Sequence, residues 1–141
     1  MRRIIYHSTA SPDMDRAALF RLVYQVRLVN ERRGLSGFLI YADQQFLQVL
    51  EGPSWKLVAT FESIRRDVRH SDVTVIDERS IREPLFRSWR MRCFDKGGAG
   101  AALDAMTAEA RGELPKVIED AVAAFFGCDR ARANLLRMHP A

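Results

Sequence analysis

Three polar side chains occupy positions where the sequence pattern favours apolar ones. Gln48 lies in the middle of an apolar run, Phe46–Leu50, and Asn30 continues the apolar stripe of a predicted helix. Tyr6 lies in a third apolar segment near the N-terminus. A buried amide without a partner costs about 1–3 kcal/mol, so each of these groups needs hydrogen bonds. If they meet in one layer, the two amides could read the amide-like edges of a planar heterocycle.

A purely structural role is the alternative for these groups. Tyrosine, glutamine and backbone could form a satisfied network that holds a sheet to its helices, which is the commoner role of buried polar residues. Enzyme chemistry is less favoured, since the three histidines, His7, His70 and His139, show no metal-ligand spacing. The sequence also has no phosphate-binding loop and no nucleophile elbow. We therefore expect either a binding site for a planar heterocycle or a structural network, without a metal site.

The strand with Gln48 is part of a predicted β-hairpin, Ser36–Gly52. Two apolar runs, Gly37–Tyr41 and Phe46–Leu50, flank a polar corner where Asp43 supplies turn chemistry. Alternation along the second run gives two faces, one with Phe46, Gln48 and Leu50 and one with Leu47 and Val49. Both faces are apolar, so we expect the hairpin at the centre of a sheet that is covered on both sides.

Two elements precede the hairpin. A strand is predicted over Arg2–Ser8, with Tyr6 on its inward face. A helix is predicted from its N-cap, Ser11, to about Arg33, where Gly34 ends it. The apolar stripe of this helix, spaced by four and three residues, is Leu19, Val23, Val26 and Asn30.

Three elements follow the hairpin. A second helix is predicted to start at the N-cap Ser54, and strands are predicted over Thr74–Ile81 and Trp89–Phe94. The apolar stripe of that helix is Leu57, Phe61, Ile64 and Val68. Cations gather at its C-terminal end, where they suit the helix dipole: Arg65, Arg66, Arg69 and His70. The element order βαββαββ predicts a ferredoxin-like α+β sandwich, with both helices on one face of a mainly antiparallel sheet.

A glycine-rich break separates a predicted domain, residues 1–95, from a C-terminal helical extension, residues 96–141. Two short helices are predicted in the extension, Ala101–Arg111 and Pro115–Phe126. The second face of the sheet needs a cover, which we expect from apolar residues of the extension: Val117, Ile118, Val122, Phe125 and Phe126. The basic end, residues 128–141, is expected to be loosely held.

Composition and charge narrow the class of protein. A chain of 141 residues with 48% hydrophobic residues can bury one core without disulfides. No apolar run approaches the roughly 20 residues of a membrane span, and no signal peptide is expected. The two cysteines, Cys93 and Cys128, form no disulfide framework, which indicates the cytoplasm. The net charge of +4 is spread over most of the chain; it is compatible with a nucleic-acid partner but is weak evidence for one. A nucleic-acid binder that uses the arginine-rich surface is therefore a third, less favoured alternative.

Together these residues resemble the BLUF family, the flavin-using sensors of blue light. The resemblance spans about Arg2–Phe94 and rests on Tyr6, Asn30, the hairpin SGFLIYADQQFLQVLEG, and SWRM with Trp89 and Met91. It implies the same ferredoxin-like fold, a bound FAD with FMN or riboflavin as alternatives, and a light sensor that is not an enzyme. The C-terminal helices resemble short members without a fused effector. A partner protein or a homodimer is therefore expected to receive the signal, at the sheet edge or at these helices.

The resemblance also implies a role for each site residue. Tyr6 would donate an electron and a proton to the light-excited flavin, and Gln48 would bridge the Tyr6 hydroxyl and the N5/O4 edge of the ring. Asn30 would hold the O4/N3 edge. Further contacts would come from Leu22, Phe46 and Ile64 along the ring and from Arg69 and His70 near its far edge or the ribityl chain. Trp89 and Met91, on one strand face, would compete for the position beside Gln48. The alternative is a small ferredoxin-like regulatory or ligand-binding domain whose buried amides are structural.

Overall fold

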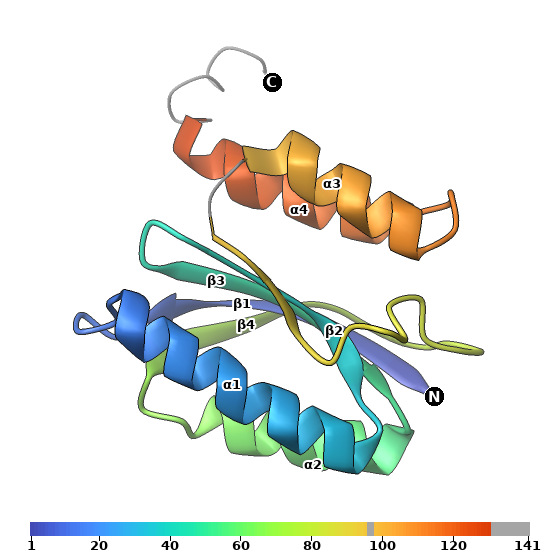
Figure 1. Cartoon of the computed structure of the whole chain (residues 1–141), viewed down its shortest axis with the longest axis horizontal. Coiled ribbons are helices and arrows are strands. Elements are labelled where there is room, and N and C mark those ends of the chain that lie inside the picture. Colours follow the sequence, from blue (N-terminus) through green and yellow to red (C-terminus); the bar gives the residue numbers. More distant parts are fainter. Residues whose placement is uncertain (96–97, 131–141) are drawn as a thin grey trace. The chain divides into compact units, whose positions relative to one another are not determined.

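A five-stranded sheet organises the first 95 residues of the computed structural model (Figure 1). In spatial order its strands are β4 (His70–Ser80), β1 (Arg2–Ala10), β3 (Gln45–Gly52), β2 (Ser36–Ala42) and β5 (Arg92–Phe94). Neighbouring strands are antiparallel except β2 and β5, which are parallel. The helices α1 (Arg16–Arg33) and α2 (Ser54–Arg65) lie on one face of the sheet. The predicted ferredoxin-like α+β sandwich is confirmed.

The structure describes residues 1–95 and 98–130, with side chains up to 127. The chain divides into two compact units, Met1–Asp95 and Lys96–Ala141. In the second unit two helices pack against each other, α3 (Gly98–Glu109) and α4 (Lys116–Arg130). That these helices cover the second apolar face of the sheet stays a prediction, and most of the basic end lies outside the described residues. No described helix is long and apolar enough to cross a membrane.

The hairpin of β2 and β3 turns at Asp43 and Gln44, within the predicted corner. Both residues have positive φ angles, 49° and 62°. A two-residue turn needs such angles to match the right-handed twist of its strands. The resulting register places Leu39 opposite Gln48, so the hairpin sets the neighbours of the buried amide.

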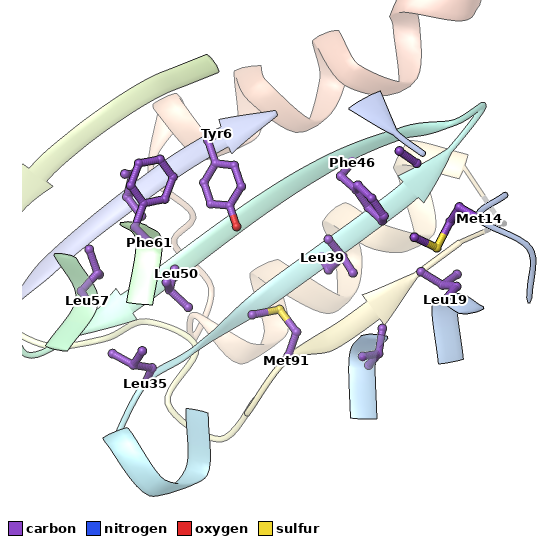
Figure 2. Packing of buried hydrophobic residues seen from close by; sticks show 13 residues of the cluster. Tyr6, Met14, Leu19, Leu35, Leu39, Phe46, Leu50, Leu57, Phe61 and Met91 are labelled. Carbon is purple, nitrogen blue, oxygen red and sulfur yellow. The ribbon is translucent and has the colours of Figure 1, made fainter. Parts of the chain in front are cut away.

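A hydrophobic core fills the space between the sheet and its two helices (Figure 2). α1 contributes Leu19 and Val23, and α2 contributes Leu57 and Phe61. The sheet contributes the face that carries Gln48, with Ile4, Tyr6, Leu39, Phe46 and Leu50. Met91, from the segment before β5, joins the same cluster. The predicted helix stripes therefore pack on the predicted inward face of the sheet.

The start of α1 differs from the prediction. Ser11 is not its N-cap, because the Ser11 carbonyl accepts the Met14 N–H at 3.0 Å and closes a turn before the helix begins. The N-cap is Asp15, whose carboxylate accepts the Ala18 N–H at 2.8 Å. Gly34 ends the helix with a left-handed φ of 71°, as predicted.

α2 and the last two strands also differ in part. Ser54 is the first residue of α2 rather than its cap, and no side chain caps that end. α2 ends at Arg65, so Val68 lies beyond the helix and is 89% exposed, not part of its apolar stripe. β4 begins four residues earlier than predicted, at His70, and β5 three residues later, at Arg92. The ends of these strands are set by where each one pairs with its neighbouring strand, and not by the β-propensity of the local sequence.

A buried ion pair anchors the connection between β4 and β5. Arg3 and Glu51 are partners across β1 and β3, and Arg3 Nε donates to Glu51 Oε2 at 3.1 Å. The other carboxylate oxygen of Glu51 accepts the backbone N–H groups of Leu85 at 2.8 Å and Phe86 at 3.1 Å. The connection is therefore tied to β3 before it returns Met91 to the core.

The hairpin predicts a specific effect of Gly37→Ala. Gly37 has a φ of 150°, and a Cβ there would lie 1.9 Å from the Val49 carbonyl oxygen, so the two strands would have to separate. We expect the free energy of unfolding, measured by urea denaturation, to fall by at least about 3 kcal/mol. Gly34→Ala is the control: its φ is 71° but it has open space, so about 1 kcal/mol is expected. An equal loss of unfolding free energy in the two variants would contradict a steric clash at Gly37.

Candidate functional site

Tyr6 and Gln48 meet across the centre of the sheet. They are direct partners in the antiparallel pairing of β1 with β3, so their side chains stand close together on one face. The Tyr6 hydroxyl donates a hydrogen bond to Gln48 Oε1. Tyr6 is 1% and Gln48 7% exposed, so little water competes for this bond. A buried phenol and a buried amide are thus hydrogen-bonded partners.

Burial governs the chemistry of Tyr6. Its ring packs edge-on against Phe61 of α2, with 5.0 Å between the ring centroids. Desolvation by burial raises the pKa of the Tyr6 phenol well above its ordinary value. The phenol therefore keeps its proton throughout the physiological pH range, and the bond to Gln48 is a path by which that proton can leave.

The nitrogen of the Gln48 amide faces a weak acceptor. Gln48 Nε2 lies 3.8 Å from Sδ of Met91, which is 1% exposed. A thioether sulfur accepts hydrogen bonds poorly. A ligand oxygen or nitrogen in this position would therefore improve the hydrogen bonding of the amide.

Asn30 lies near the end of α1 and is fully buried. Its Nδ2 donates to the Arg90 carbonyl at 2.5 Å. Its Oδ1 is buried and has no hydrogen-bond partner among the described residues. One helical turn earlier, Arg27 Nε donates to the Met91 carbonyl at 2.9 Å. α1 therefore holds the Arg90–Met91 segment by two hydrogen bonds and retains one unused amide acceptor.

A pocket lies beside Gln48, between the two helices and the sheet. Its lining is Leu22, Val26, Leu39, Phe46, Gln48, Ile64, Asp67, Arg69, His70 and Met91. All the predicted cofactor contacts except Tyr6 and Asn30 belong to this lining. Tyr6 and Asn30 are each hydrogen-bonded to a part of the pocket wall: Tyr6 to Gln48, and Asn30 to the Arg90–Met91 segment.

Three lining residues, Val26, Leu39 and Asp67, are not among the site residues predicted from the sequence. Val26 lies on the inward stripe of α1, and Leu39 opposes Gln48 across the hairpin, so the pattern contained a signal for both. Nothing in the sequence pattern placed Asp67 at the site. An acidic residue in the turn after a helix is typical of a solvated surface, and only the folded chain places it at the pocket.

Asp67 and Arg69 form a charged rim of the pocket. Arg69 donates from Nε to Asp67 Oδ1 at 3.0 Å, from Nη2 to Oδ2 at 2.6 Å, and from Nη1 to Gln25 Oε1 at 2.8 Å. Hydrogen bonding between them lowers the pKa of the Asp67 carboxyl and raises the pKa of Arg69. Arg69 is thus held at the pocket with its charge compensated, whereas Arg65 and Arg66 are exposed and lie outside the lining.

His70 forms part of the pocket wall with both ring nitrogens engaged. Nε2 lies 2.5 Å from the Ile64 carbonyl oxygen, which can only accept, so Nε2 carries the hydrogen. Nδ1 lies 2.9 Å from the Ser8 hydroxyl, which can then donate to it. The ring also meets Phe46 edge-on, at 6.3 Å between centroids. His70 therefore shapes the wall, and its two ring nitrogens are already used within the protein.

Trp89 and Met91 do not share a face. They precede β5 and are not part of a strand. Met91 points to Gln48, whereas Trp89 stacks on Phe86, with 5.3 Å between ring centroids, and meets Phe38 at 6.4 Å. Phe38 stands on the sheet face opposite Gln48, because it pairs with the next residue along β3. The expectation that both residues share a strand face is wrong, and Met91 occupies the position beside the amide.

Comparison with known proteins gives one family. The family model BLUF, described as sensors of blue-light using FAD, matches residues 1–92. Among curated proteins, the photoactivated adenylate cyclase subunit alpha of Euglena gracilis is 36% identical over 87 residues, which are 58% of this chain and 8% of that protein. The chain spans about a tenth of the length of the curated relatives that it matches.

Solved structures share the fold. Klebsiella pneumoniae BlrP1 with FMN and cyclic diGMP aligns with a TM-score of 0.77 and 29% identity, over 95% of this chain and 36% of that chain. BlrB, described as a BLUF protein in its dark state, aligns with a TM-score of 0.69 and 26% identity, over 85% of this chain and 96% of that chain. Both agree with the sandwich described above.

The Asp67–Arg69 pair predicts a contribution to stability that acid removes. Because Arg69 lowers the folded-state pKa of Asp67, the contribution is complete above the unfolded pKa of about 4, and it is lost as pH falls through the lower folded-state pKa. We expect Asp67→Asn to lower the free energy of unfolding by about 0.5–1 kcal/mol at pH 7, and this difference from the wild type to shrink as pH falls below about 4. Asp77→Asn is the comparison variant. It breaks a similar pair with Arg79 away from the pocket and should show the same dependence on pH. A difference in the free energy of unfolding between Asp67→Asn and the wild type that does not depend on pH would contradict a stabilising Asp67–Arg69 ion pair.

Proposed function

This chain belongs to the BLUF family of blue-light sensors, and we propose that it binds a flavin beside Gln48 and signals by a light-driven rearrangement of the hydrogen bonds around that amide. The observation that carries the proposal is the buried hydrogen bond from Tyr6 to Gln48 at the wall of the pocket. The part of the chain that matches the family is a sensory domain rather than an enzyme.

The residues of the pocket fit a flavin ring. Leu22, Phe46 and Ile64 supply apolar surface for the plane of the ring. Two amides have unused hydrogen-bonding capacity, since Gln48 Nε2 meets only a thioether and Asn30 Oδ1 has no described partner. These amides would hold the polar edge of the ring. A flavin held here would supply absorption of blue light and an acceptor for an electron and a proton.

The unpartnered Asn30 oxygen also bears on the structural alternative. A network whose only role was to hold the sheet to its helices would satisfy both amides, because an orphaned buried acceptor costs free energy. Asn30 Oδ1 is left without a partner by the described residues. A ligand with a hydrogen-bond donor at that position supplies what the protein lacks, which supports the flavin proposal over the structural one.

Tyr6 is the residue that can give up an electron together with its proton. Because Tyr6 is buried, loss of the electron alone would leave a buried positive charge, which is strongly disfavoured. The Tyr6 hydroxyl already directs its proton at Gln48 Oε1, so the proton can move as the electron leaves. When the electron returns, the proton returns to Tyr6, and the cycle leaves no chemical product.

Gln48 can return from this cycle in a different state. A proton received at Oε1 permits a change of tautomer, and rotation of the terminal amide exchanges its donor and its acceptor. Either change alters the bonds that Gln48 makes to Tyr6 and to Met91. The protein would then hold the light signal as a changed hydrogen-bond pattern until it relaxes in the dark.

The identity of the flavin and of the signalling partner extends this proposal. We propose FAD, the flavin that the family description names, with FMN and riboflavin as alternatives because the lining recognises a ring. A partner protein or a second copy of the chain would receive the signal. Denaturing the purified protein and separating the released flavins by chromatography identifies the cofactor.

Absorption spectroscopy of the purified protein tests the proposed function. We expect a yellow protein with a flavin spectrum that shifts to longer wavelength under blue light and recovers in the dark. A colourless protein that takes up no added FAD, FMN or riboflavin would contradict the proposal.

Tyr6→Phe separates flavin binding from photochemistry. The ring still packs against Phe61, so we expect flavin affinity within about tenfold of the wild type. Without the hydroxyl there is no proton to transfer, so we expect no red shift under blue light. Tyr41→Phe is the matched control, since the Tyr41 hydroxyl donates to the Met14 carbonyl, and it should photocycle normally. A normal photocycle in Tyr6→Phe would remove Tyr6 as the donor.

Gln48→Leu tests the amide itself. Leucine neither accepts the Tyr6 proton nor exchanges a donor for an acceptor, so we expect bound flavin, an altered dark spectrum and no light-induced shift. Gln45→Leu, on the same strand, removes an amide that donates to Thr9 Oγ1 instead, and should keep the shift. If Gln48→Leu retains the photocycle, the buried amide is structural.

A further inference from the structure

α1 carries a second apolar row, away from the core. Phe20, Tyr24 and Leu28 follow one another at intervals of four residues, so at about 3.6 residues per turn they form one row along the helix. They are 73%, 59% and 44% exposed. The core uses a different stripe of this helix, which contains Leu19 and Val23. We call Phe20, Tyr24 and Leu28 the outer row; such a contiguous exposed patch indicates an interaction site.

Arginines border the outer row on both sides. On a helix of about 100° per residue, Arg16 and Arg27 fall on one flank and Arg21 and Arg32 on the other. All four side chains are exposed, and Arg16 also pairs with Asp95 at 3.6 Å. Glu31, the acidic residue of α1, lies at the C-terminal end of the row, next to Leu28 on the helix surface. A second copy docked on this row would bring arginines of the two copies together, whereas a partner with acidic flanks would be attracted.

The width of the outer row bears on the kind of partner. It is one residue wide, with side chains four apart, which is the ridge that a second helix packs against. Insertion into a membrane interface needs a broader apolar face with the cations on the opposite side. Here the cations stand directly beside the row, which favours an amphipathic helix with acidic flanks.

The outer row is connected to the pocket through α1. Arg27, which borders the row, donates from Nε to the Met91 carbonyl at 2.9 Å. Asn30 donates to the neighbouring Arg90 carbonyl at 2.5 Å. The Met91 side chain in turn lies against Gln48. A change in the bonding of Gln48 that moves the backbone of Met91, and not only its side chain, would therefore stretch or release hydrogen bonds that α1 makes beside the row.

We propose that the outer row of α1 docks an amphipathic helix of a partner protein whose apolar face is bordered by acidic side chains, and that Arg27 couples this surface to Gln48 through Met91. The docking surface stands independently of the photochemistry. The coupling rests on the proposed function.

A synthetic peptide tests the docking surface. The probe is a helix of about five turns labelled with a dye that is excited by red light, with leucines on one face and glutamates on both flanks. Titrated with the flavin-loaded full chain, it should bind at least about tenfold more tightly than the same peptide with lysines in place of glutamates. Tyr24→Glu and Phe20→Ser should each weaken binding at least about tenfold. Val68→Glu, which adds a charge at an exposed apolar residue outside α1, should not.

Other results would overturn the assignment. Equal binding of the two peptides, no binding of either, or indifference to Tyr24→Glu would remove the proposed helix partner. Self-association of the wild type that Tyr24→Glu abolishes, seen by analytical ultracentrifugation, would assign the row to a second copy. Binding to vesicles of anionic phosphatidylglycerol that Tyr24→Glu abolishes, with no binding of the glutamate peptide, would assign it to a membrane.

The coupling is tested in the same samples under blue light. We expect the affinity for the glutamate peptide to change between dark and light in the wild type, and this change to be lost in Arg27→Ala when the two proteins are compared at the same extent of red shift. A wild type that shifts to the red with unchanged peptide affinity would overturn the coupling and leave the proposed function intact. A wild type without a red shift would instead contradict the proposed function, and the dark titrations would still decide the docking surface.

Discussion

The buried hydrogen bond between Tyr6 and Gln48 is the constraint on which the site depends. It exists because β1 and β3 pair in a register that makes these residues direct partners. Three residues along β1, the same strand pair joins Arg3 to Glu51 on the opposite face of the sheet. The sheet therefore carries one buried polar pair on each face. A shift of the β1–β3 register by one residue would move each polar side chain to the other face of the sheet. Both pairs would then lose their partners and lie among apolar side chains.

The two pairs differ in how completely they are satisfied. Glu51 accepts from Arg3 and from two backbone N–H groups, so its carboxylate is fully bonded and can only be static. Gln48 is bonded well at its oxygen and weakly at its nitrogen, where it meets the Met91 sulfur. An amide held at one end is free to change its partner at the other. The switch proposed for Gln48 requires this asymmetry, which Glu51 lacks.

The segment before β5 shows where local pattern fails. Its apolar residues favour a strand, yet pairing with β2 extends only over Arg92–Phe94. The path of the residues before it follows from distant contacts with Glu51 and with Arg27 and Asn30 of α1. These contacts decide that Met91 turns inward while Trp89 stacks on Phe86. Likewise, Asp67 reaches the pocket through contacts made in the turn after α2. Arg69 in this turn donates both to Asp67 and to Gln25 of α1.

The order of the elements, their inward faces and the three polar residues that depart from the pattern could be predicted from the amino-acid sequence. Period-two alternation, helical spacing and turn chemistry are local properties, so Gln48 and Asn30 are visible without a structure. The contact between Tyr6 and Gln48 was implied by the family resemblance, but their direct pairing across β1 and β3 is a result of folding. The unpartnered oxygen of Asn30 and the exposed outer row of α1 also became evident only in the folded chain. Strand register and loop path depend on the summed energy of contacts between residues far apart in the chain, which no local window of sequence contains.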